Sequence, residues 1–332
     1  MADAEGVVAV TGGSGFIGLS LTELLLARGR SVVSHALDDL PAQALAAFAR
    51  LPGRLTVVRG DIRDPHLRQC LGDHHVGQLF HGAVITAARE REKTSSREIL
   101  DVNVLGTVNA LDACVHAGVA RVVLASSSAV YGDAIFGDQN LGEDHVLEPV
   151  NLYGIGKVAV EGIGRRYEAL HGLRVVLARI TAAYGPWERD TGLRDTLSPL
   201  WQIARSWVAG MAVAVVAGGQ RDWVHSARVA QALAAMLDQH HLAHRIYNLS
   251  PGRVWHPLAF CQALQARDPG FTWSVAASQA QSNIQLHDNL SRERSALAVA
   301  RARQEGWCDS STLSADIDQY ATWVAVHKDW FR

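Results

Sequence analysis

Short apolar runs alternate with longer segments of helical period through roughly the first half of the chain. The runs are rich in valine, which is typical of strands that are buried on both faces of a sheet. The pattern predicts strands at residues 6–10, 55–58, 121–125 and 174–178, and two more that begin at 32–33 and at 78–80. Helices are expected between them at 19–27, 41–50, 65–71, 98–117 and 152–170.

The helix expected at 98–117 carries the clearest pattern. Ile99, Val102 and Leu105 begin an apolar stripe at helical spacing, and Gly118 suits the end of the helix. Strict alternation of strands and helices predicts an α/β fold, with a parallel, doubly wound sheet covered by helices on both faces.

The alternation stops near residue 180. Longer loops with proline, tryptophan and paired charges follow, with helices expected at 226–239 and 314–326. Neither a Ser/Gly-rich linker nor an internal repeat separates the two halves. We therefore expect a Rossmann-like region at 1–180 and a smaller lobe at 181–332 that is not an independent domain.

Composition narrows the class of partner and compartment. The 332 residues are 48% hydrophobic with a net charge of −2, and no long basic run or membrane-length apolar run occurs. This argues against nucleic acid and membranes as partners. The acidic residues 1–5 do not resemble a signal peptide. The four cysteines (Cys70, Cys114, Cys261 and Cys308) are scattered along the chain, and we interpret them as free thiols. Because free thiols suit a reducing compartment, a cytoplasmic protein is expected.

A glycine-rich turn follows the first predicted strand. Gly12, Gly15 and Gly18 are spaced G-x-x-G-x-x-G between a strand and a helix, with Phe16 and Ile17 in the helix start. Glycine allows the tight turn, close approach of a pyrophosphate and close packing of helix on sheet. The free N–H groups of the helix favour phosphate. The first 180 residues are thus expected to bind a dinucleotide.

The residues that would hold the adenosine are less regular. The second strand ends at Ala36, where an acidic residue would bind the ribose 2′-hydroxyl, and Asp38 is the expected substitute. No arginine is adjacent for a 2′-phosphate, so NAD is favoured over NADP, which stays open. Asp61 and Ile62 are expected beside the adenine, although Asp61 can also be a solvated turn residue.

A second motif predicts proton transfer. Tyr153 and Lys157 lie one helical turn apart, and the ammonium together with a positively charged nicotinamide is expected to lower the pKa of the phenol. Lys157 is also expected to hold the nicotinamide ribose. Ser127, at the end of the fifth strand, would position a substrate oxygen. Glycines at 154, 156, 162 and 164 indicate close approach of this helix to a ligand or to another helix.

In combination, these motifs resemble the extended short-chain dehydrogenase/reductase family, in its NAD-dependent epimerase/dehydratase group. The resemblance runs through most of the chain. It rests on TGGSGFIG at 11–18, GDIRD at 60–64, DVNVLGTVNAL at 101–111, SSSAVYG at 126–132, YGIGK at 153–157 and RDWVH at 221–225.

The resemblance implies roles for single residues. Tyr153 would be the acid/base, Lys157 its partner and Ser127 the hydroxyl. Ala83 would line the cofactor, and Asn103 would be a structural residue of the cofactor site that ties a water to the lysine. It also implies a homodimer formed through the helices at 98–117 and 152–170.

Departures from the family pattern bear on the substrate. Ser128-Ala129 replaces the Asp-Glu pair of sugar dehydratases, and Ala182 replaces an asparagine usual in sugar-nucleotide epimerases. An acidic pair after RDWVH is changed to Ala227-Arg228, whereas Arg221, which meets a phosphate in relatives, is retained.

The main hypothesis is therefore an NAD(P)-dependent oxidoreductase that oxidises a hydroxyl of a sugar, sugar acid or related small alcohol. A sugar-nucleotide epimerase is the alternative, and a non-catalytic dinucleotide sensor a further one. Arg189, Arg194 and Arg221 are candidates for an anionic substrate, or else form ion pairs in a solvated loop. Thr86 and Ser128 are further substrate candidates.

The fifteen histidines do not change this hypothesis. His240, His241 and His244 have the spacing of some zinc ligands, but they fall near a predicted helix end without a third ligand nearby in sequence. No metal site is expected.

Overall fold

The structure is a computed structural model that describes residues 6–137, 140–195, 197–286, 292, 294–307 and 312–332. The acidic N-terminal residues 1–5 and Cys308, about which the sequence raised expectations, lie outside this part of the chain. Cys70, Cys114 and Cys261 are free thiols, as expected.

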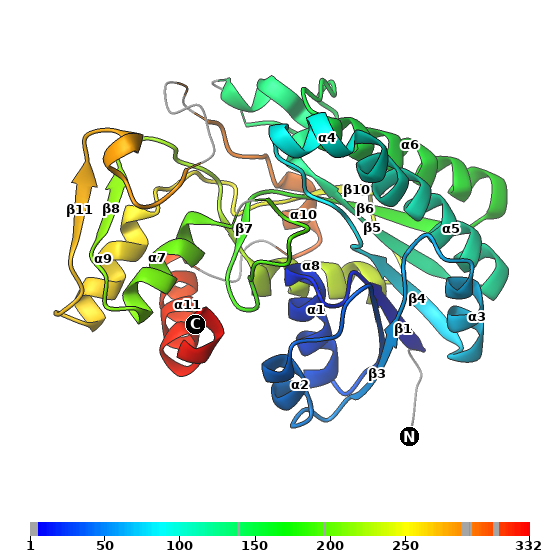
Figure 1. Cartoon of the computed structure of the whole chain (residues 1–332). Coiled ribbons are helices and arrows are strands. Elements are labelled where there is room, and N and C mark those ends of the chain that lie inside the picture. Colours follow the sequence, from blue (N-terminus) through cyan, green and yellow to red (C-terminus); the bar gives the residue numbers. More distant parts are fainter. Residues whose placement is uncertain (1–5, 138–139, 196, 287–291, 293, 308–311) are drawn as a thin grey trace.

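A seven-stranded sheet forms the centre of the molecule (Figure 1), and each of its strand pairs is parallel. The strand order is β10-β6-β5-β4-β1-β2-β3. The chain adds β2 and β3 on one side of β1 and then continues with β4 on the other side, so the switch point lies between β1 and β4. This is the doubly wound, Rossmann-like arrangement that the alternating pattern predicted. The strands are β1 (Val7–Thr11), β2 (Ser31–Ala36), β3 (Arg54–Arg59), β4 (Val76–His81), β5 (Arg121–Ser127), β6 (Arg174–Ile180) and β10 (Ile246–Leu249).

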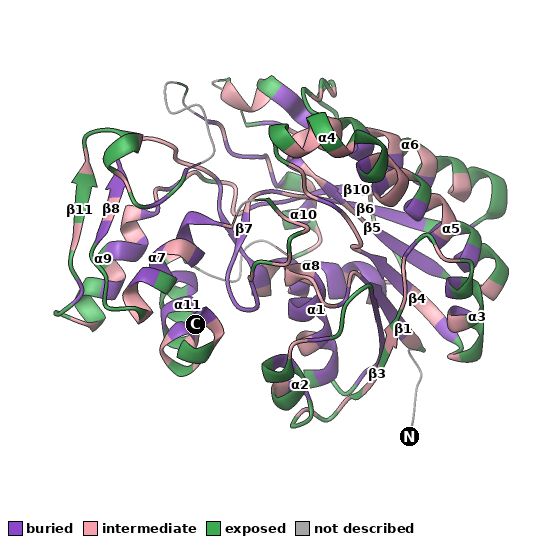
Figure 2. Ribbon diagram, in the orientation of Figure 1, coloured by how far each residue is buried: buried purple, intermediate pink, exposed green. Residues whose placement is uncertain are grey.

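Successive residues of β1 face opposite cores. Val8 and Val10 belong to one buried cluster and Ala9 to another, as the two-residue period of a strand requires. In Figure 2 the central strands are largely purple, because both faces are covered. One face carries α1 (Phe16–Ala27), α2 (Ala42–Phe48) and α8 (Ser226–Asp238), and the other α3 (His66–Asp73), α5 (Gly106–Ala117) and α6 (Leu152–His171).

The helix expected at 98–117 is in fact the end of a longer, interrupted one. It starts with α4 (Arg89–Leu100), passes through the π-helix η1 (Asp101–Leu105) and ends with α5 at Gly118, which has φ of 70°. The polar start of α4 has no apolar period, so the sequence pattern could not reveal it. Where the pattern is apolar, it located the C-terminal end correctly.

A smaller lobe lies to the left of the sheet in Figure 1. Its core is aromatic and includes Trp201, Trp223, Trp255, Phe260 and Tyr320. Its strands pair as β8 with β11 and β7 with β9. The remaining elements are β7 (Ala183–Tyr184), β8 (Val213–Val216), β9 (Val224–His225), β11 (Trp273–Ala276), α7 (Pro199–Val208), α9 (Leu258–Arg267), α10 (Ala300–Gln304), α11 (Leu313–Val326) and the 3-10 helices η2 (Ser128–Phe136), η3 (Gln279–Gln281) and η4 (Lys328–Phe331).

The second half of the chain also returns to the sheet. Strand β10 pairs with β6, and α8 packs beside α1 in the same buried cluster. Sheet and lobe are therefore joined by several passes of the chain. None of the helices in the described ranges has both the length and the apolar character needed to cross a bilayer.

Candidate functional site

A single cavity of about 670 Å³ opens along the carboxyl edge of the sheet. This is the edge at which open parallel sheets bind ligands. Its walls come from the β1–α1 turn, the ends of β2 to β6, the start of α6 and a loop of the lobe. Of the site residues predicted from the sequence, the cavity brings together Gly12, Gly15, Phe16, Ile17, Gly18, Asp38, Asp61, Ile62, Ala83, Thr86, Ser127, Ser128, Tyr153, Lys157, Arg189, Arg194 and Arg221.

The glycine turn has the close approaches expected of a phosphate-binding loop. Gly12 has φ of +69°, and a Cβ there would lie 2.7 Å from the carbonyl carbon of Gly82. A Cβ on Gly18 would lie 2.3 Å from the Gly12 oxygen. Helix α1 follows from Gly15 without a side-chain cap. Its first N–H groups therefore point to the cavity with no side chain bound, which suits a pyrophosphate.

At the adenosine end, β2 and β3 are joined through Gly60, whose N–H donates to the Ala36 oxygen at 2.9 Å. Asp38 and Asp61 both line the cavity. The Asp61 carboxylate accepts hydrogen bonds from the Arg63 guanidinium at 2.6 and 2.9 Å, and this bonding holds its pKa below the usual range. Asp61 is thus a charged acceptor that is already paired with Arg63, whereas the charge of Asp38 acts on Arg189.

Tyr153, Ser127 and Lys157 meet where β5 ends beside the start of α6. The Asn151 side chain caps this helix by accepting from the Gly154 N–H at 2.8 Å. The Tyr153 side chain hydrogen-bonds with the hydroxyls of Ser127 and Thr86. The Lys157 ammonium lies 5.7 Å from the centre of the Tyr153 ring. A phenol, an amine and two hydroxyls therefore share one small volume.

Burial dominates the electrostatics of this group. It raises the pKa of the Tyr153 phenol, against the hydrogen bond with Ser127 and the charge of Arg194. It lowers the pKa of Lys157 to about 8, against the charge of Glu161. The expected lowering of the phenol pKa by Lys157 is therefore not seen in the chain itself, and the cation that acts in that direction is Arg194.

Interactions with β5 and with the next turn of α6 hold the Lys157 side chain. Its ammonium donates to the Ala125 oxygen at 2.6 Å. One helical turn on, the buried Glu161 carboxylate binds Ser126 at 2.6 Å and the buried guanidinium of Arg179 at 2.7 Å. Sequence reasoning did not single out Glu161 or Arg179. Their pairing joins α6 to β6, so no local pattern could have indicated it.

Asn103 is the one predicted site residue that does not line the cavity. Its side chain accepts from the Ile85 N–H at 2.8 Å and donates to the Ile85 oxygen at 2.9 Å. Asn103 thus fixes the backbone next to Thr86.

The arginines fall into two groups. Arg189 donates to the Ser14 oxygen at 3.3 Å, and Arg194 lies 5.9 Å from the centre of the Phe16 ring, so both lie over the glycine turn. Arg221 and the buried Arg294 line the same cavity. The three predicted arginines therefore share one cavity, with Arg189 and Arg194 against the glycine turn. Arg294 was missed because it belongs to no motif.

A family model fits most of this chain. The NAD dependent epimerase/dehydratase family matches residues 8–250. The chain belongs to this family. Its members are NAD-dependent enzymes, so the expected family, fold class, enzyme class and cofactor are confirmed.

Two curated relatives are similar in sequence to part of this epimerase/dehydratase family member. A putative UDP-glucose 4-epimerase of Methanocaldococcus jannaschii is 28% identical over 58% of this chain and 61% of its own length. A UDP-glucose 4-epimerase of Azospirillum brasilense is 33% identical over 52% of this chain and 47% of its own. The chain thus spans about half to three-fifths of these relatives.

Solved structures cover almost the whole chain. MoeE5 in complex with UDP-glucuronic acid and NAD is 25% identical, with a TM-score of 0.75 over 97% of this chain and 99% of that one. The similarity extends through the lobe, beyond the residues that the family model matches.

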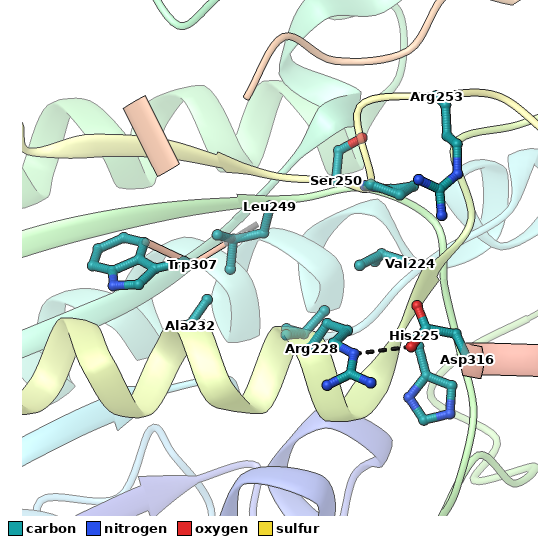
Figure 3. A pocket seen from close by; sticks show the side chains of 11 residues that line it. Val224, His225, Arg228, Ala232, Leu249, Ser250, Arg253, Trp307 and Asp316 are labelled. Atoms are coloured by element: carbon teal, nitrogen blue, oxygen red, sulfur yellow. Dashed lines mark hydrogen bonds and ion pairs between the residues drawn. The ribbon is translucent and has the colours of Figure 1, made fainter. Parts of the chain in front are cut away.

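One departure from the family pattern has a structural explanation. Arg228 lines a separate cavity of about 40 Å³ beside α8, with room for a few waters at most (Figure 3). There it donates to Asp316 of α11 at 2.9 Å. Arg228 therefore ties α8 to the C-terminal helix and does not line the large cavity.

No group of three or more His, Cys, Asp or Glu side chains that could hold a metal ion occurs within the residues that the structure describes. His240, His241 and His244 follow the end of α8 at Asp238 and lie in a loop.

Proposed function

We propose that this protein is an NAD-dependent oxidoreductase that oxidises a secondary hydroxyl of an anionic sugar or sugar derivative. One observation carries the proposal: the glycine turn, the Tyr153 group and the arginines of the lobe line one continuous cavity. A dinucleotide and a charged substrate can therefore meet at Tyr153.

The chain's own residues supply the binding and the proton transfer. The uncapped start of α1 holds the pyrophosphate, and Asp38 is the acceptor we propose for the adenosine ribose. Bound NAD supplies the hydride acceptor. Ser127 orients the substrate oxygen, the Tyr153 phenolate takes the proton from that oxygen and becomes the phenol, and the Lys157 ammonium stabilises the phenolate form that accepts the proton.

Substrate recognition is proposed for two arginines of the lobe. Arg221 and Arg294 line the cavity as well, so in this proposal they bind an anionic group of the substrate while Arg189 and Arg194, which touch the glycine turn, face the cofactor. Ser128 and Thr86 are the neutral side chains beside the reacting carbon in this arrangement.

A second candidate is 4-epimerisation of a sugar nucleotide. The relatives named UDP-glucose 4-epimerase favour it, and these two arginines of the lobe suit a diphosphate. In that reaction the hydride returns to the opposite face of the same ketone. Ala182, which lines the cavity where many epimerases have asparagine, argues for a different or smaller anionic group.

We also propose a homodimer and a reducing, cytoplasmic setting. Leu105, Ile155 and Leu170 expose apolar side chains on η1 and α6, the surface expected to pair. The free thiols Cys114 and Cys261 are buried, which suits a protein that needs no disulfide.

The proposal is tested by incubating the protein with NAD and a panel of sugar acids, sugar phosphates and UDP-sugars. Absorbance of the reduced nicotinamide detects net oxidation, and product analysis detects epimerisation. Tyr153→Phe should lower the rate by about a thousandfold, because the proton acceptor is lost, with dinucleotide affinity nearly unchanged.

Tyr167→Phe is the matched control on the same helix. The Tyr167 hydroxyl donates to Asp112 at 2.6 Å and is not part of the cavity, so this variant should keep the wild-type rate. Full activity of Tyr153→Phe would contradict the mechanism, whatever the substrate.

A further inference from the structure

A loop between β7 and α7 lines the cavity and touches both the glycine turn and the segment after β4. We call residues 188–195 the strap; they lie in the green segment that joins β7 to α7 in Figure 1. Most of the strap lines the cavity, including Arg189, Thr191, Leu193, Arg194 and Asp195.

The first end of the strap is anchored in the lobe. The Glu188 side chain is buried and accepts from the Ser198 N–H at 2.7 Å and the Ser198 hydroxyl at 2.5 Å. Its main-chain oxygen accepts from the Trp330 indole at 2.8 Å. Arg194 folds back onto Glu188 as an ion pair of 3.0 Å. These contacts hold the base of the strap independently of a ligand.

On one wall of the cavity, the strap touches the glycine turn. Arg189 donates to the Ser14 oxygen at 3.3 Å, and the guanidinium of Arg194 lies 5.9 Å from the centre of the Phe16 ring. These are the residues at which α1 begins and at which the pyrophosphate is proposed to lie.

On the opposite wall, the strap is bonded to the segment after β4. The Thr86 N–H donates to the Leu193 oxygen at 2.8 Å, and the Asp195 N–H donates to the Thr86 oxygen at 3.2 Å. The Asp195 carboxylate accepts from the Ala88 N–H at 2.6 Å and from Arg91 at 3.3 Å. Arg91 also donates to the Gly192 oxygen at 2.6 Å.

We propose that the strap closes over the bound dinucleotide and that the Arg91–Asp195 clasp controls its release. A dinucleotide that runs from the glycine turn to Tyr153 would pass between walls that the strap joins. Release then requires the bonds to Thr86, Ala88 and Arg91 to break together. This inference rests on the proposed function, because it takes the cavity to be the dinucleotide site.

The chemical consequence is that the cofactor stays bound for longer than one hydride transfer takes. If release is slow compared with catalysis, the hydride taken from the substrate is returned before the reduced dinucleotide can leave. The strap would therefore favour reactions without net oxidation, which is the second candidate function above. A dehydrogenase that exchanges its cofactor in each turnover would need the clasp to open each time.

The test measures release directly, without a substrate. Protein loaded with NADH is mixed with excess NAD in a stopped-flow instrument, and the change in NADH fluorescence gives the dissociation rate. Asp195→Ala and Arg91→Ala should each release NADH about tenfold faster than wild type, because each removes the clasp. The double variant should be no faster than the faster single variant, because both residues act in one contact.

Glu90→Gln is the matched control. It breaks an exposed ion pair with Lys93 on the same helix, at 2.7 Å, and leaves the strap untouched. Its release rate should equal that of wild type. Circular dichroism and urea unfolding of each variant verify that the fold is retained.

Equal release from wild type and both clasp variants would overturn the strap while leaving the proposed function in place. A wild-type protein that binds no NADH would overturn both proposals. If Tyr153→Phe kept the wild-type catalytic rate while the two clasp variants still released NADH faster, the catalytic proposal alone would be overturned.

Discussion

Lys157 is a buried cation beside a buried phenol, and its charge depends on its burial and on the Glu161 carboxylate one helical turn away. Burial lowers its pKa to about 8, so its ammonium begins to lose its proton only slightly above neutral pH. The Glu161 carboxylate opposes this shift, and Glu161 is itself held by Arg179. The pair below the site therefore helps to keep the ammonium charged at neutral pH.

A pH profile should reveal this dependence. The value of kcat/KM reports ionisations of the free enzyme, and it should fall as pH rises through about 8, because neutral Lys157 cannot stabilise the Tyr153 phenolate. Glu161→Gln should move the fall to lower pH, since the charge that raises the pKa of Lys157 is gone.

Glu168→Gln is the control for that experiment. Glu168 lies near the other end of α6 and pairs with Arg245 on the surface, at 2.8 Å. Its profile should match that of wild type. An unchanged profile for Glu161→Gln would contradict the assigned coupling, even if the variant is less stable because Arg179 has lost its partner.

Nearly all of the site residues predicted from the motifs line the cavity, because each motif has a fixed place on a strand end or helix start. The motifs could not predict what depends on packing between distant segments. Arg294 lines the cavity from far along the chain, and Glu161 with Arg179 joins two elements. The raised pKa of the phenol in the chain itself could not be predicted for the same reason: the burial of Tyr153 comes from the fold and not from its neighbours in sequence.

Among the helices, α6 shows which glycines the fold uses. A Cβ on Gly154 would lie 2.6 Å from the Ala129 oxygen, and one on Gly164 would lie 2.8 Å from a methyl of Leu124. A Cβ on Gly156 would meet its nearest neighbour at an ordinary 3.7 Å, and Gly162 has nothing within 4 Å. The close approach of α6 to neighbouring segments, expected from its four glycines, therefore occurs at Gly154 and Gly164 only, among these four.

Gly154→Ala should therefore lower activity, because the start of α6 has to move away from the backbone at 129 and carries Tyr153 with it. We expect a loss of about tenfold or more in kcat/KM, with cofactor affinity changed less. Gly156→Ala is the control: its Cβ fits, so the variant should keep its activity and gain up to about 1 kcal/mol in the free energy of unfolding. Equal activities for the two variants would contradict the reasoning.

Element positions followed from the pattern where it was apolar and regular. The ends of the helices at Gly118 and Gly172 need a left-handed residue, with φ of 70° and 69°, and glycine supplies it. The π-helix η1 could not be predicted. It places Asn103 against the main chain of Ile85, and that contact belongs to the tertiary structure.

At the scale of the whole molecule, the outer side of the helix layer is the surface proposed for pairing. Leu105 is 59% exposed and Leu170 is 55% exposed, and the outer sides of α5 and α6 are largely green in Figure 2. Apolar side chains of this size gain free energy when a second copy covers them.

Leu105→Lys should weaken the proposed dimer by at least about tenfold, because the charge has to be desolvated on pairing. Light scattering after size-exclusion chromatography, over a range of concentrations, measures the mass. Leu45→Lys, on α2 and 40% exposed, is the control and should leave the mass unchanged. A wild-type chain that stays monomeric at every concentration would refute the pairing.

The repeated passage of the chain between sheet and lobe limits how the protein could be re-engineered. A graft that replaced everything after residue 180 with the corresponding part of another family member would also remove β10 from the edge beside β6 and α8 from its place against α1. The donor would have to rebuild half of one face of the recipient's core. Recombining substrate preferences in this protein therefore calls for exchange of separate loops, with their junctions in the lobe, and not for a single crossover.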